Sequence, residues 1–267
     1  MTRVTIVVPC YNEAERLDDE SFLRLVDELP TLKWLFVNDG SRDDTEARLR
    51  ALAQRRPTRI DALSLAQNGG KAEAVRQGLR AALDDGAEVV GYYDADLSTP
   101  PEELRRLIEI METHDASAVL GARVGLLGHD IHRRSSRHYL GRVFASVASL
   151  ILRLRVYDTQ CGAKLFRRSP TFRAALQEPF HSRWAFDVEL IGRLLAGVGG
   201  TPALGASDFL EVPLHAWRDV PGSKLRSTAM VGALRDLARI GLALASERRA
   251  QSRAKKADQA QAKADQA

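Results

Sequence analysis

Long apolar runs are missing from this sequence of 267 residues. The longest stretch without a charged side chain, residues 194–207, contains four glycines and one proline. It falls short of the ~20 apolar residues that a membrane-spanning helix needs. The first residues also lack the charged, apolar and cleavage regions of a secretory signal. We therefore expect a cytoplasmic chain that does not cross a membrane.

Cysteine is scarce as well, because Cys10 and Cys161 are the only two in the sequence. Two cysteines are too few for a disulfide framework, and neither stands at a spacing typical of a metal site. The sequence therefore predicts two reduced, buried thiols.

A strong excess of basic charge is absent from most of the chain. The formal net charge is +4, and the six basic and three acidic residues from Ser246 onward carry +3 of it. The remainder is close to neutral and has no nucleic-acid-binding signature, so we expect no nucleic acid partner. With 45% hydrophobic and 28% charged residues, the chain is typical of a globular protein with one large core.

Apolar strand patterns alternate with helical patterns through residue 122. Strands are expected at residues 4–8, 34–37, 59–65, 88–93 and 117–122, and helices near residues 13–29, 43–55, 70–84 and 101–114. This alternation predicts an α/β fold with a mostly parallel central sheet and helices on both faces. Ligands of such sheets bind beyond the carboxyl ends of the strands.

The pattern changes after residue 123. An arginine-rich stretch leads into the apolar residues 143–152, and a second amphipathic segment, residues 225–245, places Met230, Leu234, Leu237 and Leu244 on one face. That helix either packs on the domain or lies on a membrane surface. The expected division is a domain at 1–224, an amphipathic helix at 225–250 and a disordered or frayed polar tail at 251–267.

The first strand ends in PCYNE instead of a glycine-rich dinucleotide motif, which argues against an NAD or FAD enzyme. Pro9 and Tyr11 offer a rigid turn and a flat ring, and Glu13 offers an acceptor for hydroxyls. This combination suits a base and a ribose. The alternative is an ordinary helix start capped by Asn12.

The second strand ends in NDGS, where the Asp39 carboxylate can accept the N3–H group of a pyrimidine. The alternative is a turn that starts a helix. At the third junction, NGGK opens a helix with glycines and Lys71, which favours phosphate. The surrounding residues do not match the phosphate-binding loop of nucleoside triphosphatases.

The fourth junction, DADLS, places Asp94 and Asp96 just after a buried strand. Carboxylates two residues apart on an extended strand point the same way. Two hard oxygen donors suit Mg²⁺ or Mn²⁺ bridging a diphosphate.

In this order and spacing, PCYNE, NDGS, NGGK and DADLS resemble the inverting nucleotide-sugar glycosyltransferases of family 2, which have the Rossmann-like GT-A fold. Four later segments strengthen this resemblance toward dolichyl-phosphate β-glucosyltransferases and bacterial polyprenyl-phosphate glycosyltransferases. They are GAR (121–123), DTQCGAKLF (158–166), RWAFDVEL (183–190) and PGSKL (221–225). The resemblance covers about residues 3–226.

The resemblance implies transfer of a sugar, expected to be glucose, from a UDP-sugar to a polyprenyl or dolichyl phosphate. It implies Mg²⁺ or Mn²⁺ at Asp94 and Asp96. The implied nucleotide-sugar-binding residues are Pro9, Tyr11, Glu13, Asp39, Lys71, Asp94, Ala95, Asp96, Arg123 and Lys224. Ser98 stands where the mannosyl branch often has glutamine, which argues against GDP-mannose.

A lipid phosphate would be bound by Arg133, Arg134 or Arg137, with residues 143–152 beside the prenyl chain. The alternative is a solvated loop before a buried helix. The amphipathic segment and the basic tail predict a peripheral location at the cytoplasmic membrane face. Relatives usually carry transmembrane helices beside the catalytic domain, and this sequence has none.

Asp158 and Asp187 are the candidate catalytic residues. A general base is needed only for a hydroxyl acceptor, because a phosphate monoester is already largely a dianion at pH 7. Their alternative roles are in a turn and at a helix start. Two other functions stay open: the same donor chemistry with a soluble or glycan hydroxyl acceptor, and a non-catalytic nucleotide-sugar-binding protein.

Overall fold

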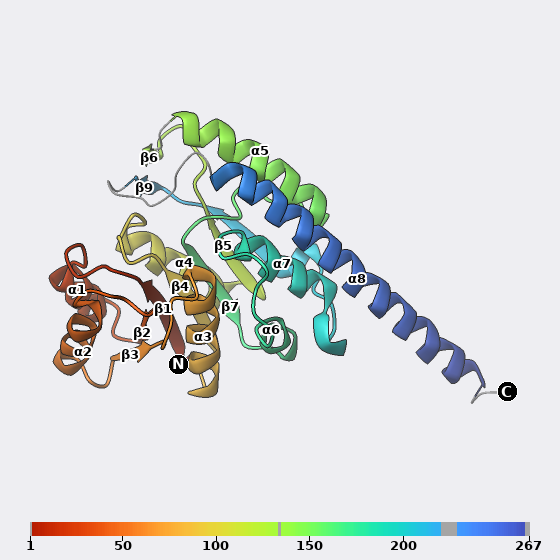
Figure 1. The fold of residues 1–267 in the computed structure, drawn as a ribbon, viewed down its shortest axis with the longest axis horizontal. Coiled ribbons are helices and arrows are strands. Elements are labelled where there is room, and N and C mark those ends of the chain that lie inside the picture. The colour runs from red at the N-terminus through yellow and green to blue at the C-terminus, as the bar shows by residue number, and fades with distance from the viewer. Residues whose placement is uncertain (1, 133–134, 220–228, 265–267) are drawn as a thin grey trace.

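The computed structural model describes residues 2–132, 135–219 and 229–264. Its centre is a seven-stranded sheet (Figure 1). The strands lie in the order β3 (Ile60–Ser64), β2 (Leu32–Asn38), β1 (Val4–Cys10), β4 (Val89–Tyr93), β7 (Ala163–Arg167), β5 (Ala118–Ala122) and β8 (Phe209–Pro213). All neighbours are parallel except β7, which is antiparallel to both β4 and β5. The predicted α/β class with a mostly parallel sheet is confirmed.

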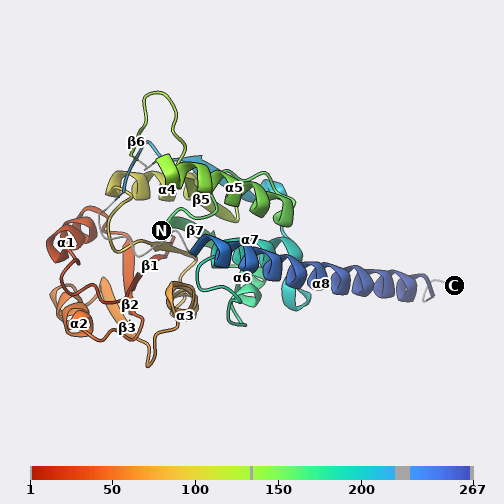
Figure 2. The same cartoon turned by 45° about the horizontal axis from the view of Figure 1, so that its top comes forward.

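Helices cover both faces of this sheet. They are α1 (Asp19–Glu28), α2 (Thr45–Arg55), α3 (Lys71–Asp84), α4 (Pro101–Thr113), α5 (Ser135–Leu152), α6 (Pro170–Ala175), α7 (Phe186–Ala196) and α8 (Ala229–Ala264). Short 3₁₀ turns, η1 (Val198–Gly200) and η2 (Ala206–Asp208), precede β8. A separate ribbon pairs β6 (Asp130–His132) with β9 (Ala216–Arg218) in parallel. Figure 2 shows this ribbon at the end of the molecule where α5 begins.

The start of α1 differs from the prediction. The chain first makes a turn in which Arg16 and Leu17 donate backbone hydrogen bonds to the Glu13 carbonyl. The helix then begins at Asp19, because Asp18 caps it by accepting from the Ser21 N–H group at 3.0 Å. A helix start near residue 13, capped by Asn12, is therefore wrong.

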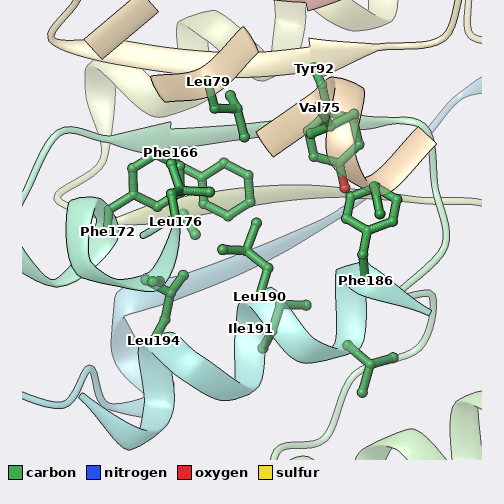
Figure 3. Close-up of a cluster of buried hydrophobic side chains, with 14 of the residues drawn as sticks. Val75, Leu79, Tyr92, Phe166, Phe172, Leu176, Phe186, Leu190, Ile191 and Leu194 are labelled. Atoms are coloured by element: carbon green, nitrogen blue, oxygen red, sulfur yellow. The ribbon is translucent and has the colours of Figure 1, made fainter. Parts of the chain in front are cut away.

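Two hydrophobic cores lie on opposite faces of the sheet. One contains apolar side chains from α1, α2 and α4, and the other contains side chains from α3 and from α5 through α8. Figure 3 shows the second core, where Leu190 and Leu194 of α7 pack near Phe166 and Phe172. The rings of these two phenylalanines stack with centroids 4.8 Å apart. The sheet is thus buried on both faces, which fixes the positions of its carboxyl ends.

The apolar face of α8 packs on the domain. Leu237, Ile240 and Leu244 are at most 2% exposed and belong to the second core. Gly192 of α7 lets α8 approach closely, since a Cβ atom there would lie 2.2 Å from a methyl carbon of Leu244. The predicted amphipathic helix is present. Its apolar face was expected either to pack on the domain or to lie on a membrane surface, and the structure supports packing on the domain. The side chains of Met230 and Leu234 lie outside the described residues.

Beyond the last packed turn, α8 continues to Ala264 and projects from the body (Figures 1 and 2). The segment that we expected to be disordered or frayed is therefore helical through that residue. Its alanine, glutamine, lysine and arginine residues are strong helix formers, which explains a helix without an apolar face. Within the described residues, every helix is too short or too polar to span a bilayer.

Candidate functional site

The loops after β1 and β2 are braced against each other. The Asn12 N–H group donates to Ser41 Oγ at 3.0 Å, and the Arg42 N–H group donates to Asn12 Oδ1 at 2.9 Å. The Glu13 N–H group donates to Thr45 Oγ1 at 2.8 Å. Asn12 adopts a φ of 49°, which asparagine tolerates better than most residues. These contacts hold the PCYNE segment, with the half-buried Pro9, Tyr11 and Glu13, at the carboxyl edge of the sheet.

Asp39 holds the third loop in place. Its carboxylate accepts from the backbone N–H groups of Gly69 and Gly70, both at 2.8 Å, and from Asn68 Nδ2 at 2.9 Å. The residue is 2% exposed, and burial raises the pKa of its carboxyl group against the effect of these hydrogen bonds. A carboxylate offers about four acceptor positions. Asp39 therefore anchors the NGGK loop and keeps capacity for one further N–H group.

Lys71 and Asp94 form an ion pair between the loop after β3 and the loop after β4, two strands that β2 and β1 separate in the sheet. Lys71 is the first residue of α3, and its Nζ atom lies 2.5 Å from Asp94 Oδ1. Burial by itself would lower the pKa of Lys71, but the charges of Asp94, Asp187 and Asp96 outweigh it and raise the pKa. The ammonium group thus stays charged over the physiological range. Sequence analysis assigned both residues to the donor site, and the structure brings them together.

Local contacts in the DADLS loop restrict the positions of its two carboxylates. Asp96 Oδ1 accepts from the Ser98 N–H group at 3.0 Å, and Leu97 adopts a φ of 53°. Asp94 lies directly over Gly162, where an added Cβ atom would be 1.8 Å from Asp94 Oδ2. Only glycine at position 162 leaves room for this carboxylate.

The two aspartates fit a divalent cation that also binds a substrate. Both offer hard oxygen atoms, which Mg²⁺ and Mn²⁺ prefer. The Lys71 ammonium beside Asp94 shows that this loop attracts positive charge. Within the described residues there is no cluster of three or more histidine, cysteine, aspartate or glutamate side chains suited to a metal. A cation here would therefore need further oxygen ligands, such as those of a diphosphate.

Asp187 lies at the first turn of α7 and is paired with a lysine that sequence analysis did not single out. Lys164 of β7 is fully buried, and its Nζ atom lies 2.7 Å from Asp187 Oδ1. The Tyr92 hydroxyl donates to the same oxygen. Burial, and then the charge of Asp187, raise the pKa of Tyr92 well above its ordinary value, so the hydroxyl keeps its proton. A charged lysine within the otherwise apolar strand sequence AKLF is the pattern from which a buried ion pair could have been predicted.

Asp158 forms a two-pronged ion pair with Arg123. The Arg123 Nε and Nη2 atoms lie 2.6 and 2.9 Å from its carboxylate oxygens, and the Arg123 backbone N–H group also donates to it. Arg123 packs over the ring of Trp217 at 5.2 Å. Although burial acts against it, the charge of Asp158 raises the pKa of Arg123. Asp158, a candidate general base, is therefore ion-paired with an arginine that stays charged.

Glu211 and Arg183 are two further residues that sequence analysis missed. The Glu211 carboxylate accepts from the backbone N–H groups of Tyr157 and Asp158 and so fixes the turn that carries Asp158. Arg183 donates to the Asn68 carbonyl at 2.8 Å and so connects the RWAFDVEL segment to the NGGK loop. Both contacts join segments far apart in the sequence, so local patterns carry no signal for them.

The predicted acceptor-binding arginines cannot be placed. Arg133, Arg134 and Lys224 lie outside the described residues, as does the side chain of Arg137. The site that is described therefore consists of the PCYNE, NDGS, NGGK and DADLS loops together with two ion pairs. The charge of Asp187, paired with Lys164, acts on Lys71, and the charge of Asp94 acts on Arg123, paired with Asp158.

Comparison with known proteins gives one family. The model described as glycosyl transferase family 2 matches residues 5–173. A dolichyl-phosphate beta-glucosyltransferase of Trichomonas vaginalis is 32% identical over 251 residues, which cover 89% of this chain and 70% of that protein. The undecaprenyl-phosphate mannosyltransferase of Micrococcus luteus is 30% identical over 243 residues, which cover 90% of this chain and 95% of that protein.

Solved structures share the fold at lower identity. The glucosyl-3-phosphoglycerate synthase of Mycobacterium tuberculosis in complex with UDP superposes with a TM-score of 0.63 and 19% identity, covering 90% of this chain and 80% of the other. A structure of that enzyme with Mn²⁺, UDP and glucosyl-3-phosphoglycerate gives a TM-score of 0.61 at 20% identity, covering 88% and 80%. These matches confirm the expected GT-A architecture.

Proposed function

The chain belongs to glycosyl transferase family 2 and is a glycosyltransferase, and on that premise we propose that it transfers glucose from UDP-glucose to a polyprenyl phosphate. The names of its relatives support a lipid phosphate as acceptor, since they include dolichyl-phosphate and undecaprenyl-phosphate transferases. The observation that carries the proposal is the Lys71 ammonium beside Asp94 and Asp96 at the carboxyl end of β4. Carboxylates and a cation in this arrangement suit a metal-bound diphosphate.

The donor is proposed to lie across the first three strand ends. Pro9, Tyr11 and Glu13 would contact uridine, and the remaining acceptor position of Asp39 would take the uracil N3–H group. The NGGK loop, held by Asp39, would bring Lys71 to the diphosphate. Ala95 lies between the two aspartates of DADLS and would contact the sugar-phosphate. Lys224 completes the proposed donor site.

Asp94 and Asp96 would hold Mg²⁺ or Mn²⁺. When bound there, the cation would stabilise the negative charge that develops on the departing diphosphate. Gly162 keeps the Asp94 carboxylate in its place, and Ser98 fixes Asp96. Lys71 would add a positive charge on the same side and would remain protonated throughout the pH range of the reaction.

The reaction is proposed as a direct displacement with inversion. An oxygen of the acceptor phosphate attacks the anomeric carbon while the bond to the UDP oxygen breaks and UDP leaves. Because the phosphate is largely a dianion at pH 7, no proton has to be removed. The pairing of Asp158 with Arg123 and of Asp187 with Lys164 suits positioning better than proton transfer. Both pairs would fix the shape and charge of the site.

The acceptor is proposed to reach this site from a membrane surface. Arg133, Arg134 or Arg137 would bind its phosphate through charge-assisted hydrogen bonds. With a lipid acceptor, the enzyme is proposed to act as a peripheral protein at the cytoplasmic face of a membrane.

A donor and acceptor screen with the purified chain tests the proposal. We expect product with UDP-glucose, Mg²⁺ or Mn²⁺ and a short prenyl phosphate, and none with GDP-mannose, in excess EDTA, or with free prenol. Asp96→Asn should abolish turnover, whereas Asp115→Asn, an exposed aspartate after α4, is the matched control and should not. Transfer to prenol or a simple sugar, but not to the phosphate, would overturn the acceptor assignment.

A further inference from the structure

Strongly exposed large hydrophobic side chains are unevenly distributed over the described residues. They are Leu126 at 48%, Leu127 at 103%, Val143 at 57%, Leu150 at 79% and Leu242 at 74% exposure. The first two lie in the loop between β5 and β6, the next two on α5 and the last on α8. In the part of the chain that is described, the first 125 residues contribute none. Four of these five side chains lie within residues 126–150, and exposed apolar side chains gathered in one region mark an interaction surface.

The loop between β5 and β6 stands clear of the domain. A Cβ atom added at Gly125 or Gly128 would meet no atom of the described residues within 4 Å. Figure 2 shows the loop projecting beyond the neighbouring helices. Leu127 is fully exposed at this position, although burial of one leucine side chain is worth about 1.5–3 kcal/mol. With respect to the described residues, the loop therefore presents Leu127 fully and Leu126 about half to solvent.

The outward face of α5 also exposes two large apolar side chains, with Ser146 between them. Val143, Ser146 and Leu150 are exposed at three- and four-residue spacing, so they share one face of the helix. The opposite face, with Phe144 and Ala148, is buried in the core. Both sides of α5 thus carry apolar residues, one toward the core and one toward solvent.

The segment that carries α5 is rich in arginine. Residues 131–157, which contain α5, include six arginines and no aspartate or glutamate. Arg153 and Arg155 are exposed just after the helix. Apolar side chains bordered by arginines match a bilayer with anionic headgroups, which offers hydrocarbon and negative charge together. A soluble acidic partner or a nucleic acid would use the arginines but would leave Leu127 and Leu150 exposed.

The surface is continuous with the site along the chain. The loop begins directly after Arg123, and the segment that follows α5 leads to Asp158. These two residues form the ion pair beside DADLS. An acceptor phosphate could therefore enter the site while its hydrocarbon chain stays in a lipid layer.

We propose that the loop of residues 124–129 and the outward face of α5 form the surface by which this protein binds an anionic lipid bilayer. The proposed lipid acceptor explains why the protein would bind a membrane, so the inference rests on the proposed function in this respect. The exposed side chains that support it do not depend on the reaction. It replaces the apolar face of α8, which is buried, as the membrane-contacting element.

Vesicle flotation of the full chain tests this surface. Two double variants, Leu126→Ser with Leu127→Ser and Val143→Ser with Leu150→Ser, should each weaken binding to phosphatidylglycerol-containing vesicles about tenfold or more. Leu242→Ser is the matched control, because it removes an equally exposed leucine from α8 and should bind as the original chain does. All replaced side chains are exposed, so the melting temperatures should stay equal.

The outcomes separate this inference from the proposed function. Variants that float like the original chain, or loss of binding only in Leu242→Ser, would overturn the inference. If the original chain bound neutral phosphatidylcholine vesicles as tightly as phosphatidylglycerol-containing ones, the proposed preference for an anionic bilayer would be wrong. Turnover of a short, water-soluble prenyl phosphate should be unchanged in the Leu126→Ser, Leu127→Ser variant, while its turnover of a long-chain acceptor in vesicles should fall. If no prenyl phosphate is turned over by any form, the proposed function fails while the flotation result stands.

Discussion

Lys164 and Asp187 form an ion pair of 2.7 Å between β7 and α7, and neither side chain is more than 6% exposed. Removing one partner of a buried pair leaves the other as an uncompensated charge, which costs about 3–5 kcal/mol. We expect Lys164→Met to lower the free energy of unfolding by roughly this amount in urea denaturation. The double variant with Asp187→Asn should recover part of the loss. A single variant as stable as the original chain would contradict this.

Gly162→Ala should displace Asp94, because the new Cβ atom would overlap its carboxylate. We expect a large loss of metal-dependent turnover and a higher metal concentration for half-maximal activity, measured by titration with Mn²⁺. Gly125→Ala is the control, since no atom in the described part of the chain lies within 4 Å of the added atom there. Equal activity of both variants would show that Asp94 does not need its present position.

Asp39→Ala should weaken UDP binding through two effects that calorimetry can separate. Loss of the anchor for Gly69 and Gly70 would loosen the NGGK loop and lower affinity for UDP and GDP alike. Loss of a charge-assisted hydrogen bond to uracil would lower UDP affinity by an additional ~1.5–3 kcal/mol. We therefore expect the original chain to prefer UDP and the variant to lose this preference. Equal affinity of the original chain for both nucleotides would remove the role in uracil selection.

Asp158→Asn should reduce turnover by less than the ~10²–10⁴-fold expected for loss of a general base. The phosphate acceptor brings its own negative charge, and Asp158 is occupied by Arg123. We expect the pH profile of kcat to keep its shape in this variant. Disappearance of its acidic limb, together with a loss above that range, would identify Asp158 as the base of a hydroxyl acceptor reaction.

Both thiols should be unreactive in the folded protein. Cys10 and Cys161 are buried, and burial, as the largest cause, raises the pKa of Cys161 to about 11. Because only the thiolate reacts, labelling by iodoacetamide at pH 8 should be very slow and should accelerate as the pH rises toward that value. In denaturant both cysteines should react at once. Rapid labelling of the folded chain at neutral pH would contradict this.

The first half of the fold could be predicted because its signals are local. Each of the first five strands is an apolar run bounded by turn residues, and the structure has a strand at each. β7 could not be predicted in its place, because its position between β4 and β5 depends on pairing with strands far away in sequence. The helical period of α8 identified its apolar face but could not show whether protein or lipid covers it.

The site was partly predictable for the same reason. Lys71 and Asp94 follow strands with clear patterns, so their common location at the carboxyl edge could be inferred, and they are in contact. The partners of the two later aspartates depend on tertiary structure. Arg123 faces Asp158 from 35 positions away, and Lys164 reaches Asp187 from another element. The predicted donor, acceptor and catalytic roles of these residues stay predictions.

The antiparallel strand β7 also sets an order of events during synthesis. It lies between β4 and β5, but it is translated after both. About 40 residues separate β5 from β7, so a ribosome adding ≈5–20 residues per second leaves both edges unpaired for roughly 2–8 s. Unpaired edges of buried strands are templates for association with other chains. A nascent chain halted before Ala163 should therefore be prone to aggregation, and one that includes Arg167 should be able to close the centre of the sheet.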